Sequence, residues 1–291
     1  MKKEPLVSIG LPVFNGEKYL VKSLNSLINQ TYHKIEIIIC DDNSNDSSFE
    51  ICKNYENKNK NILFYQNQKR LGVVPNMIKS LKLAKGDYFI WASQDDIWQD
   101  NFISKLLELS TKEESVISMC ATQVIDNSGK NIIQYKFPNL CQYNNSIYNV
   151  ARSILCPVNG ELLKMSIFIH GLIKTDYFRK SLSAYPGYFR SERHLLIQLA
   201  LSGKFSYLNE VLFYKRVHGD NSRRIGDKLF NKLWYSNIRN FFQMITSIIF
   251  SPIIKLKFKV LSFFIILNYL EFRFKIFIVP ILKKMLSRNV Y

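Results

Sequence analysis

Residues 35–44 read Ile-Glu-Ile-Ile-Ile-Cys-Asp-Asp-Asn-Ser, a β-branched run that ends in two aspartates. A short apolar run of this composition with a polar boundary predicts a buried strand over residues 35–40. The polar residues 43–48 that follow predict a loop leading into a helix. Asp41 and Asp42 therefore stand just beyond the carboxyl end of a strand, which is where open α/β sheets bind their ligands.

The segments around this strand alternate between strand and helix. Residues 74–84 have the apolar spacing of a helix, and three short, apolar runs predict strands at residues 6–12, 62–65 and 88–92. Strands that alternate with helices predict βαβ units and a parallel sheet, so the fold class is α/β. A second acidic pair, Asp95 and Asp96, falls beyond the last of these strands. We expect both acidic pairs at one edge of the sheet.

The first helix is expected directly after the first strand. Asn15 can cap this helix, and apolar side chains at helical spacing predict one buried face, which consists of Tyr19, Leu20, Leu24, Leu27 and Ile28. In the second half of the chain, residues 194–201 predict an amphipathic helix that Gly203 ends. The other elements expected there are a helix at residues 101–109 and strands at residues 116–125, 165–173 and 211–217.

The net charge of +17 over 291 residues favours anionic partners. Residues 226–291 hold eleven Lys and Arg against two acidic residues, so this tail carries +9 and the preceding 225 residues carry +8. Charged residues interrupt each apolar run of the tail before it reaches about 18 residues, which disfavours a spanning helix. Phe and Ile interleaved with Lys predict helices that lie on an anionic membrane surface. A helical cap over the rest of the chain is the alternative.

The five cysteines are scattered and show no CxxC spacing, which is typical of reduced thiols. The N-terminal residues lack the long apolar run of a secretory signal. We therefore expect a cytoplasmic location, peripheral on the inner face of the cytoplasmic membrane.

The two acidic pairs suggest a specific chemistry. Carboxylates on a loop beyond a strand can hold a hard divalent cation, with phosphate oxygens completing its coordination. Such a cation neutralises the charge that develops when a diphosphate leaves. The alternative for Asp95 and Asp96 is structural, because aspartates in such loops often cap the next helix, here one that starts near Asp100.

Several separated motifs resemble glycosyltransferase family 2. They are SIGLPVFNGE at residues 8–17, SLNSL at 23–27, QTY at 30–32, EIIICDDNS at 36–44, KGDY at 85–88 and QDD at 94–96. The resemblance covers about residues 5–224 and is densest before residue 100. It implies a GT-A, Rossmann-like fold with a mainly parallel central sheet flanked by helices. The catalytic domain would be residues 1–225, with a nucleotide-binding half to about residue 100 and an acceptor half at about 101–225, followed by a helical, basic and hydrophobic tail at 226–291.

The resemblance also implies roles for individual residues. Pro12, Val13, Phe14 and Glu17 match the loop around the base and ribose. Asp42 matches the carboxylate that accepts a hydrogen bond from the base imide, which favours uracil or thymine, with UDP as the expected nucleotide. Asp95 and Asp96 match the DXD-like metal motif, although Ser93 stands where the family is often acidic. Asp96 is the expected ligand of Mg²⁺ or Mn²⁺. The expected nucleotide-binding residues are thus Pro12, Val13, Phe14, Glu17, Asp42, Arg70 and Asp95.

A catalytic base and a second metal ligand are expected in the second half. Glu192, at the start of a helix, matches the family's base that deprotonates the acceptor hydroxyl; a first-turn acidic residue that favours the helix dipole is the alternative. Residues 216–218 resemble the family's RxH element. His218 would bind the metal or the diphosphate, with Arg223 and Arg224 on phosphate, and the alternative is an exposed loop histidine. His170 is expected in the core.

The combined interpretation is an inverting glycosyltransferase. It would move a sugar from a nucleoside-diphosphate sugar to a hydroxyl of a glycan or lipid-linked acceptor in cell-surface polysaccharide synthesis. A nucleotidyltransferase would need a glycine-rich phosphate loop after the first strand, which residues 10–14 do not provide. A nucleic-acid-binding module would need Lys and Arg clustered on one face of the main domain, so no nucleic-acid partner is expected. A non-catalytic relative stays open because of Ser93 and because residue 193 is not Asp.

Overall fold

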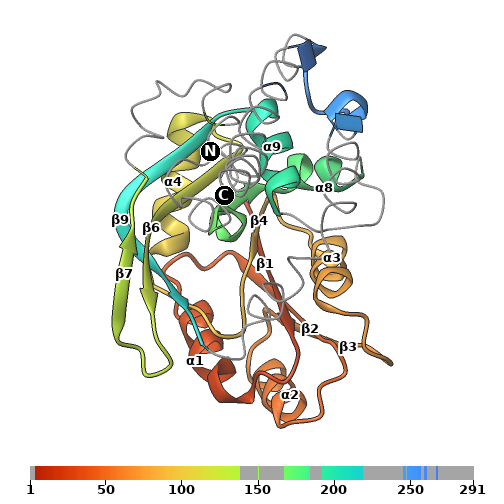
Figure 1. The fold of residues 1–291 in the computed structure, drawn as a ribbon. Helices are drawn as coiled ribbons and strands as arrows, with labels where there is room; N and C mark the ends of the chain where they lie inside the picture. Colours follow the sequence, from red (N-terminus) through yellow and green to blue (C-terminus); the bar gives the residue numbers. More distant parts are fainter. Residues whose placement is uncertain are drawn as a thin grey trace, which may run out of the picture.

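The computed structural model describes residues 4–137, 150, 167–183, 192–218, 245–246, 248–256, 259–260 and 267 (Figure 1). The side chains of residues 183 and 192–194 lie outside this description. The described residues also leave out most of the expected tail, residues 226–291. They leave out most of residues 138–191 in the expected acceptor half as well. The expected division into a catalytic domain and a tail therefore stays a prediction.

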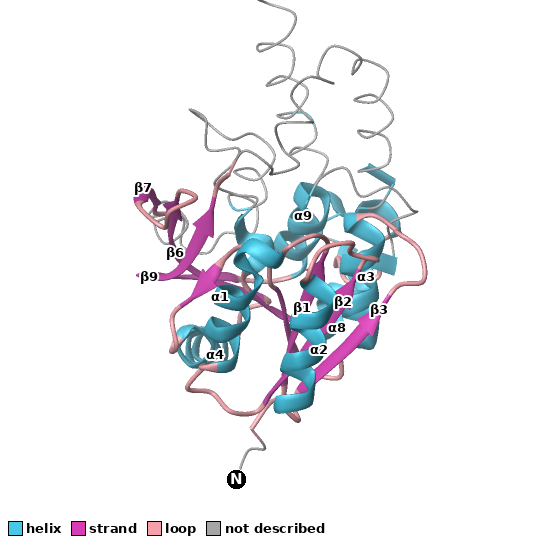
Figure 2. Ribbon diagram, turned by 90° about the horizontal axis from the view of Figure 1, so that it is seen from below, coloured by secondary structure: helices cyan, strands magenta, loops and turns pink. Residues whose placement is uncertain are grey.

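Nine of the described strands form one sheet, in the order β3-β2-β1-β4-β8-β6-β9-β5, with β7 paired to β6. Helices cover both faces of this sheet (Figures 1 and 2). The strands are β1 (Val7–Val13), β2 (Ile35–Asp41), β3 (Ile62–Gln66), β4 (Tyr88–Trp91), β5 (Ile97–Trp98), β6 (Ile117–Ile125), β7 (Asn131–Tyr135), β8 (Leu172–Lys174) and β9 (Phe205–Arg216). The helices are α1 (Glu17–Ile28), α2 (Ser48–Lys58), α3 (Val73–Leu83), α4 (Phe102–Glu113), α8 (Thr175–Ser183) and α9 (Glu192–Ser202), and η1 (Ile167–His170) is a 3₁₀ helix.

The first four strands of the chain are parallel, as the alternation of strand and helix predicts. β1 lies between β2 and β4, and β3 pairs with the other side of β2. Their carboxyl ends therefore meet at one edge of the sheet, with Phe14 after β1, Asp42 after β2 and Asp95 after β4. The expected α/β fold with helices on both faces is confirmed.

The second half of the sheet is mixed, and its pairing completes the same edge. β8 is antiparallel to both β4 and β6, while β9 runs parallel to β6. β5 follows Asp96 directly and pairs antiparallel with β9, where Ile97 faces Tyr214 and Trp98 faces Phe213. This pairing brings residues 215–218 beside the second acidic pair.

The strand expected over residues 165–173 is wrong in its first part. Residues 167–170 form η1, and a strand begins only at Leu172. Gly171 separates the two, and a Cβ on it would lie 2.5 Å from the Ser118 carbonyl oxygen on β6. The close approach of the two backbones forces the chain to turn here before it can join the sheet.

Two helix expectations are also corrected. Asn15 does not cap α1, because its φ of 48° places it in the left-handed region and Gly16 is the residue before the helix; its side-chain oxygen instead accepts a hydrogen bond from Asn45 N at 3.0 Å. The helix over residues 194–201 is not amphipathic, since each side chain from Leu195 to Leu201 is buried. A helix that is apolar nearly all round fits an interior position.

Candidate functional site

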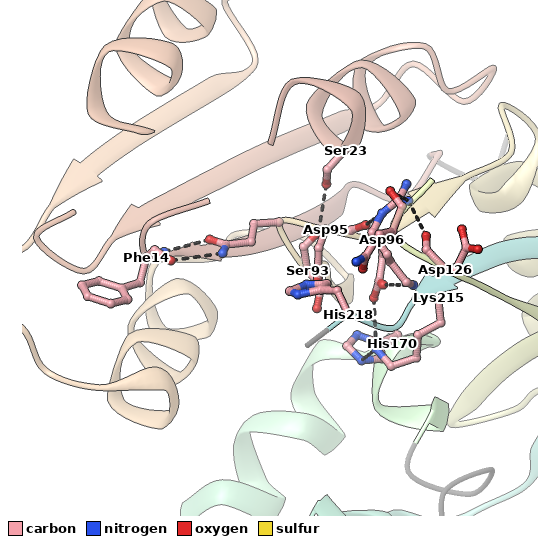
Figure 3. Close-up of polar contacts among 12 residues, drawn as sticks. Phe14, Ser23, Ser93, Asp95, Asp96, Asp126, His170, Lys215 and His218 are labelled. Atoms are coloured by element: carbon pink, nitrogen blue, oxygen red, sulfur yellow. Dashed lines mark hydrogen bonds and ion pairs between the residues drawn. The ribbon is translucent and has the colours of Figure 1, made fainter. Parts of the chain in front are cut away.

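The site lies at the carboxyl edge of the sheet, where residues from four strands converge (Figure 3). The residue after β1 is Phe14, and the loop between β4 and β5 carries Gln94, Asp95 and Asp96. The end of β9 supplies Lys215 and Arg216, followed by His218. The alternative in which Asp95 and Asp96 cap the next helix is wrong, because β5 follows them and α4 begins only at Phe102.

Asp42 is buried at this edge and organises the loop that carries Arg70. Its Oδ1 accepts hydrogen bonds from Asn67 Nδ2 at 2.8 Å and Leu71 N at 2.7 Å, and its Oδ2 accepts one from Gly72 N at 2.8 Å. Only 2% of the residue is exposed. Three donors on one buried carboxylate form a charge-assisted anchor. The expected contact between Asp42 and a base stays a prediction, and the anchoring role is one that the sequence did not indicate.

Phe14 and Arg70 stack on each other at the mouth of the site. The Arg70 guanidinium carbon lies 3.8 Å from the centroid of the Phe14 ring, which is cation–π geometry. The Phe14 backbone is held on both sides by Gln94, whose Oε1 accepts from Phe14 N at 2.8 Å and whose Nε2 donates to Phe14 O at 3.1 Å (Figure 3). The two residues form a flat aromatic and cationic surface that a planar base can contact.

The other residues expected near the base have different surroundings. The Val13 side chain belongs to the core, and its carbonyl accepts a hydrogen bond from Asp42 N at 2.8 Å. Pro12 is half-buried. Glu17 is exposed in the first turn of α1 and accepts a hydrogen bond from Ser47 N at 3.0 Å. In the described residues these three shape the edge of the sheet and the two loops beside Phe14.

Asp95 and His218 form a pair that the chain brings together from positions 123 residues apart. His218 Nε2 lies 2.8 Å from Asp95 Oδ2, and both side chains are mostly buried. His218 Nδ1 is buried and has no hydrogen-bond partner among the described residues, while Tyr19 packs against the ring with centroids 5.2 Å apart. Burial, with a further contribution from the adjacent Asp96 charge, raises the pKa of Asp95.

Asp96 points into a different environment. It is fully buried, its Oδ2 lies 3.1 Å from Lys215 Nζ, and its Oδ1 accepts a hydrogen bond from Arg216 N at 2.8 Å. Lys215 Nζ is also 3.4 Å from His170 Nε2, and His170 Nδ1 is 2.8 Å from Trp91 O. Because a carbonyl oxygen only accepts, Nδ1 carries the proton and Nε2 of the neutral ring faces the lysine. His170 is buried as expected, and it also supports the site.

Arg216 connects the loop that carries Asp95 with the turn that begins at Asp126. Its Nε donates to Asp95 O at 3.0 Å and its Nη1 to Asp126 O at 2.8 Å, and its guanidinium lies over the Tyr19 ring at 4.6 Å. These contacts fix the position of the Asp95 backbone. In the RxH element, the arginine thus positions the loop and the histidine faces the acidic side chain.

Comparison with known proteins assigns this arrangement to a family. Residues 8–171, more than half of the chain, match the family model described as Glycosyl transferase family 2. The chain belongs to glycosyltransferase family 2. The family 2 match ends at the residue after η1, so it contains β1 to β4 with both acidic pairs.

Relatives of this family 2 chain come from several bacteria. Chondroitin synthase of Escherichia coli is 26% identical over 223 residues, which cover 76% of this chain and 30% of that protein. An uncharacterised glycosyltransferase of Rickettsia typhi is 35% identical over 130 residues, which cover 44% of this chain and 40% of the relative. Glycosyltransferase GlyG of Streptococcus pneumoniae is 29% identical over 130 residues, which cover 45% of this chain and 43% of the relative. The chain thus spans less than half the length of these relatives.

Solved structures with similar folds confirm the architecture. S. aureus TarS, in its complex with UDP-GlcNAc, matches 93% of this family 2 chain with a TM-score of 0.69 at 17% identity, over 73% of the TarS chain. The mannosyltransferase PcManGT from Pyrobaculum calidifontis, solved with GDP-Man and Mn²⁺, matches 100% of the chain with a TM-score of 0.55 at 14% identity, over 82% of that structure. The likeness shows the GT-A fold expected from the sequence.

The residues of this family 2 site offer a partial set of metal ligands. Among the described residues, no group of three or more His, Cys, Asp or Glu side chains is arranged to hold a metal ion. Asp95 Oδ2 and His218 Nε2, which lie 2.8 Å apart, nevertheless present an oxygen and a nitrogen donor in one place. Carboxylate oxygens suit Mg²⁺ and Mn²⁺, and imidazole is a common additional ligand. The donors therefore fit a cation whose remaining ligands come from a bound diphosphate.

Three expected residues lie wholly or partly outside the described residues. Glu192 is the first residue of α9, but its side chain is outside the description, so its role as the base stays a prediction. Its helix, α9, is packed in the interior of the protein, because residues 195–201 are buried. Arg223 and Arg224 lie outside the described residues.

Sequence reasoning missed Lys215 and Gln94. Lys215 contacts Asp96 across 119 residues, and Gln94 holds Phe14 across 80. The sequence feature that could have indicated Gln94 as a site residue is its position in the QDD motif, at the carboxyl edge of the sheet. Lys215 precedes the RxH element and carried no signal of its own, because its partner depends on how β9 pairs with β5.

Proposed function

We propose that this chain transfers a sugar from a nucleoside-diphosphate sugar, with UDP as the nucleotide, to a hydroxyl of a glycan or lipid-linked acceptor, inverting the anomeric carbon. The observation that carries the proposal is that the Asp95–His218 pair and the Phe14–Arg70 surface occur at the same carboxyl edge of a GT-A sheet, where Gln94, the residue before Asp95, holds the Phe14 backbone. A base-stacking surface next to an acidic and imidazole pair suits a nucleotide with a diphosphate. The similarity to TarS, solved with UDP-GlcNAc, supports this choice of donor class.

The nucleotide base is proposed to stack at Phe14 and Arg70. Arg70 is exposed, so it can move from the Phe14 ring to let a planar base enter or to reach a phosphate. Asp42 Oδ2 accepts a single hydrogen bond, from Gly72 N, and a carboxylate oxygen has two acceptor positions. The second position can take the imide N–H of uracil. Pro12, Val13 and Glu17 would border this pocket.

A divalent cation, Mg²⁺ or Mn²⁺, is proposed at Asp95 and His218. When bound, it would neutralise charge on the departing diphosphate. Asp96, the ligand expected from the sequence, has both oxygens engaged by Lys215 and by the Arg216 backbone. The geometry therefore favours Asp95 as the carboxylate ligand and gives Asp96 the task of holding the ends of β5 and β9 together.

Glu192 is proposed as the base that removes the proton of the acceptor hydroxyl. The hydroxyl must lose this proton as its oxygen attacks the anomeric carbon, and a carboxylate at hydrogen-bond distance can accept it. The start of a helix that is buried over residues 195–201 can hold such a group at a fixed place. One displacement of the diphosphate by the acceptor oxygen inverts the anomeric configuration.

We further propose that the tail attaches the enzyme to the anionic inner face of the cytoplasmic membrane, where it would serve cell-surface polysaccharide synthesis. In the described part of the tail, Ile248 and Ile254 are buried in the core, whereas Phe250 and Leu256 are 76% and 77% exposed beside Lys255. One side of the segment thus packs on the domain and another leaves apolar groups and a cation outside, which suits a membrane interface. None of the helices in the described residues has the length and apolarity needed to cross a bilayer.

The donor proposal is tested by thermal shift and by sugar transfer. UDP with Mn²⁺ should raise the melting temperature more than GDP does, because a bound ligand stabilises the fold by mass action. Asp95→Asn should remove the Mn²⁺-dependent part of that shift, and Glu192→Gln should abolish transfer while leaving UDP binding intact. Full transfer activity in Glu192→Gln would remove Glu192 as the base, and the absence of any nucleotide-induced shift would refute the donor class.

The membrane proposal is tested by sedimentation with liposomes that contain anionic lipid. The double variant Phe250→Glu/Leu256→Glu should lose binding, whereas Ile132→Glu, which changes an apolar side chain on β7 that is 59% exposed, should keep it. Equal binding by the double variant and the wild type would place the contact elsewhere.

A further inference from the structure

Lys215 is a mostly buried lysine beside the proposed cation site. Its Nζ contacts Asp96 Oδ2 at 3.1 Å and His170 Nε2 at 3.4 Å, and it lies 5.9 Å from the Phe213 ring centroid (Figure 3). Buried lysines are uncommon unless they have a charged partner. Here the partner is Asp96, one of two adjacent carboxylates. Lys215 therefore pairs with Asp96, and His218 pairs with Asp95.

The anchors of Lys215 are themselves fixed. Asp96 is held on its other oxygen by Arg216 N at 2.8 Å, and His170 is held by Trp91 O at 2.8 Å. The His170 proton is on Nδ1, so its Nε2 can accept from the ammonium. The ammonium group of Lys215 is therefore held next to Asp96 by partners that are themselves fixed.

This placement has a direct consequence for a cation. A divalent ion that used both carboxylates would have to displace the ammonium from Asp96, and while the ammonium stays it repels the ion. Among the described residues, Asp95 and His218 then remain as ligands at this place, which is fewer than the six or more ligands that hard cations generally take. A diphosphate can supply the missing oxygens.

We propose that Lys215 is a positioning residue that withholds Asp96 from the divalent cation, so that the cation binds weakly to the enzyme alone and tightly together with the donor diphosphate. The inference rests on the proposed function and deepens it, because it states the order of binding. It assigns Lys215 no contact with the reacting atoms. Its effect is on affinity and on the coupling between cation and nucleotide.

The test measures Mn²⁺ binding to the full chain by the electron paramagnetic resonance signal of free Mn²⁺, with and without UDP. In the wild type, UDP should tighten Mn²⁺ binding strongly. Lys215→Met should tighten binding without UDP by about tenfold, since it frees Asp96 and removes a nearby positive charge. The gain on adding UDP should shrink by a similar factor. Lys215→Arg should behave like the wild type, because it keeps the charge.

Two further variants guard against misfolding and unspecific charge effects. Lys105→Met removes a lysine that pairs with Glu210 away from the site, and it should leave Mn²⁺ binding unchanged. Lys215→Met/Asp96→Asn removes the buried charge pair as a whole, so it should fold even where Lys215→Met does not. It should bind Mn²⁺ within about threefold of the wild type, because Asp95 and His218 are retained.

The outcomes separate this inference from the proposed function. An unchanged or weaker Mn²⁺ affinity in folded Lys215→Met, or a loss of binding in the double variant, would overturn the role of Lys215 while UDP binding and transfer still stood. Absence of Mn²⁺ binding to the wild type even with UDP would overturn both. A tenfold gain in Lys215→Met with a wild-type affinity in the double variant would support the inference.

Discussion

The anchoring of residues 67–72 by Asp42 gives a quantitative prediction for Asp42→Asn. If the asparagine carbonyl takes the place of Oδ1, the bonds from Asn67 and Leu71 remain but lose their charge assistance. The amide NH₂ then faces Gly72 N, so a donor meets a donor where Oδ2 accepted a bond at 2.8 Å. An unpaired donor at a mostly buried position and two weakened bonds together cost about 3 kcal/mol. The free energy of unfolding should fall by that amount.

The measurement is urea unfolding without nucleotide, followed by UDP binding to the folded variant. Asp126→Asn is the matched control, because Asp126 also accepts three hydrogen bonds, from Ser128 N, Ser128 Oγ and Lys130 N, but does so on an exposed turn. Its loss of stability should be much smaller. If Asp42→Asn kept the wild-type unfolding free energy and only weakened UDP binding, Asp42 would be a nucleotide contact and not the anchor of the loop.

Three further predictions follow from local geometry. Gly86→Ala should destabilise the chain by about 2–3 kcal/mol in urea unfolding, since its Cβ would lie 2.7 Å from Leu6 O and Ser8 N, whereas Gly129→Ala, in open space at a φ of 93°, should cost about 1 kcal/mol; equal losses would contradict the clash. Phe14→Leu should weaken UDP binding about fivefold in calorimetry through loss of stacking, and an unchanged affinity would place the base elsewhere. Burial raises the pKa of Cys40, Cys52 and Cys120 to about 12, so iodoacetamide at pH 8.5 should label these thiols only in urea; labelling of the folded chain at the unfolded rate would show that they are accessible. Because the same thiols ionise near 9 in the unfolded chain, their contribution to the free energy of unfolding should be lost as the pH rises from 9 to 12.

The parallel half of the fold could be predicted because its signals are local. The first acidic pair stands at the end of β2, with Asp41 its last residue and Asp42 the next. The alternation of strand and helix up to β4 leaves one sheet topology with both acidic pairs at the carboxyl edge. The same reasoning placed Asp42 and Asp95 at one edge of the sheet, and the family resemblance added Phe14. It worked because each of these residues stands within four positions of the carboxyl end of a strand.

The errors arose where distant backbone decides local structure. Residues 167–170 have the composition of a strand, yet the close approach of Gly171 to β6 turns them into η1. α9 looked amphipathic, but its surroundings bury each side of it over residues 195–201. Asn15 has the chemistry of a cap, but its positive φ and its bond to Asn45 place it outside the helix. Propensity is a weak guide when tertiary contacts compete with it.

The acidic motif shows why residue roles need the folded chain. Asp95 and Asp96 are neighbours with the same side chain, and a sequence motif gives no physical reason to separate them. The pairing of β5 with β9 places Lys215 and the Arg216 backbone on Asp96 and leaves His218 on Asp95. Asp96 is thereby paired with a lysine inside the protein, whereas the pKa of Asp95 is raised by burial and by the adjacent Asp96 charge. The proposed cation would therefore use Asp95, and the lysine that makes the two carboxylates different lies 119 residues from Asp96 in sequence.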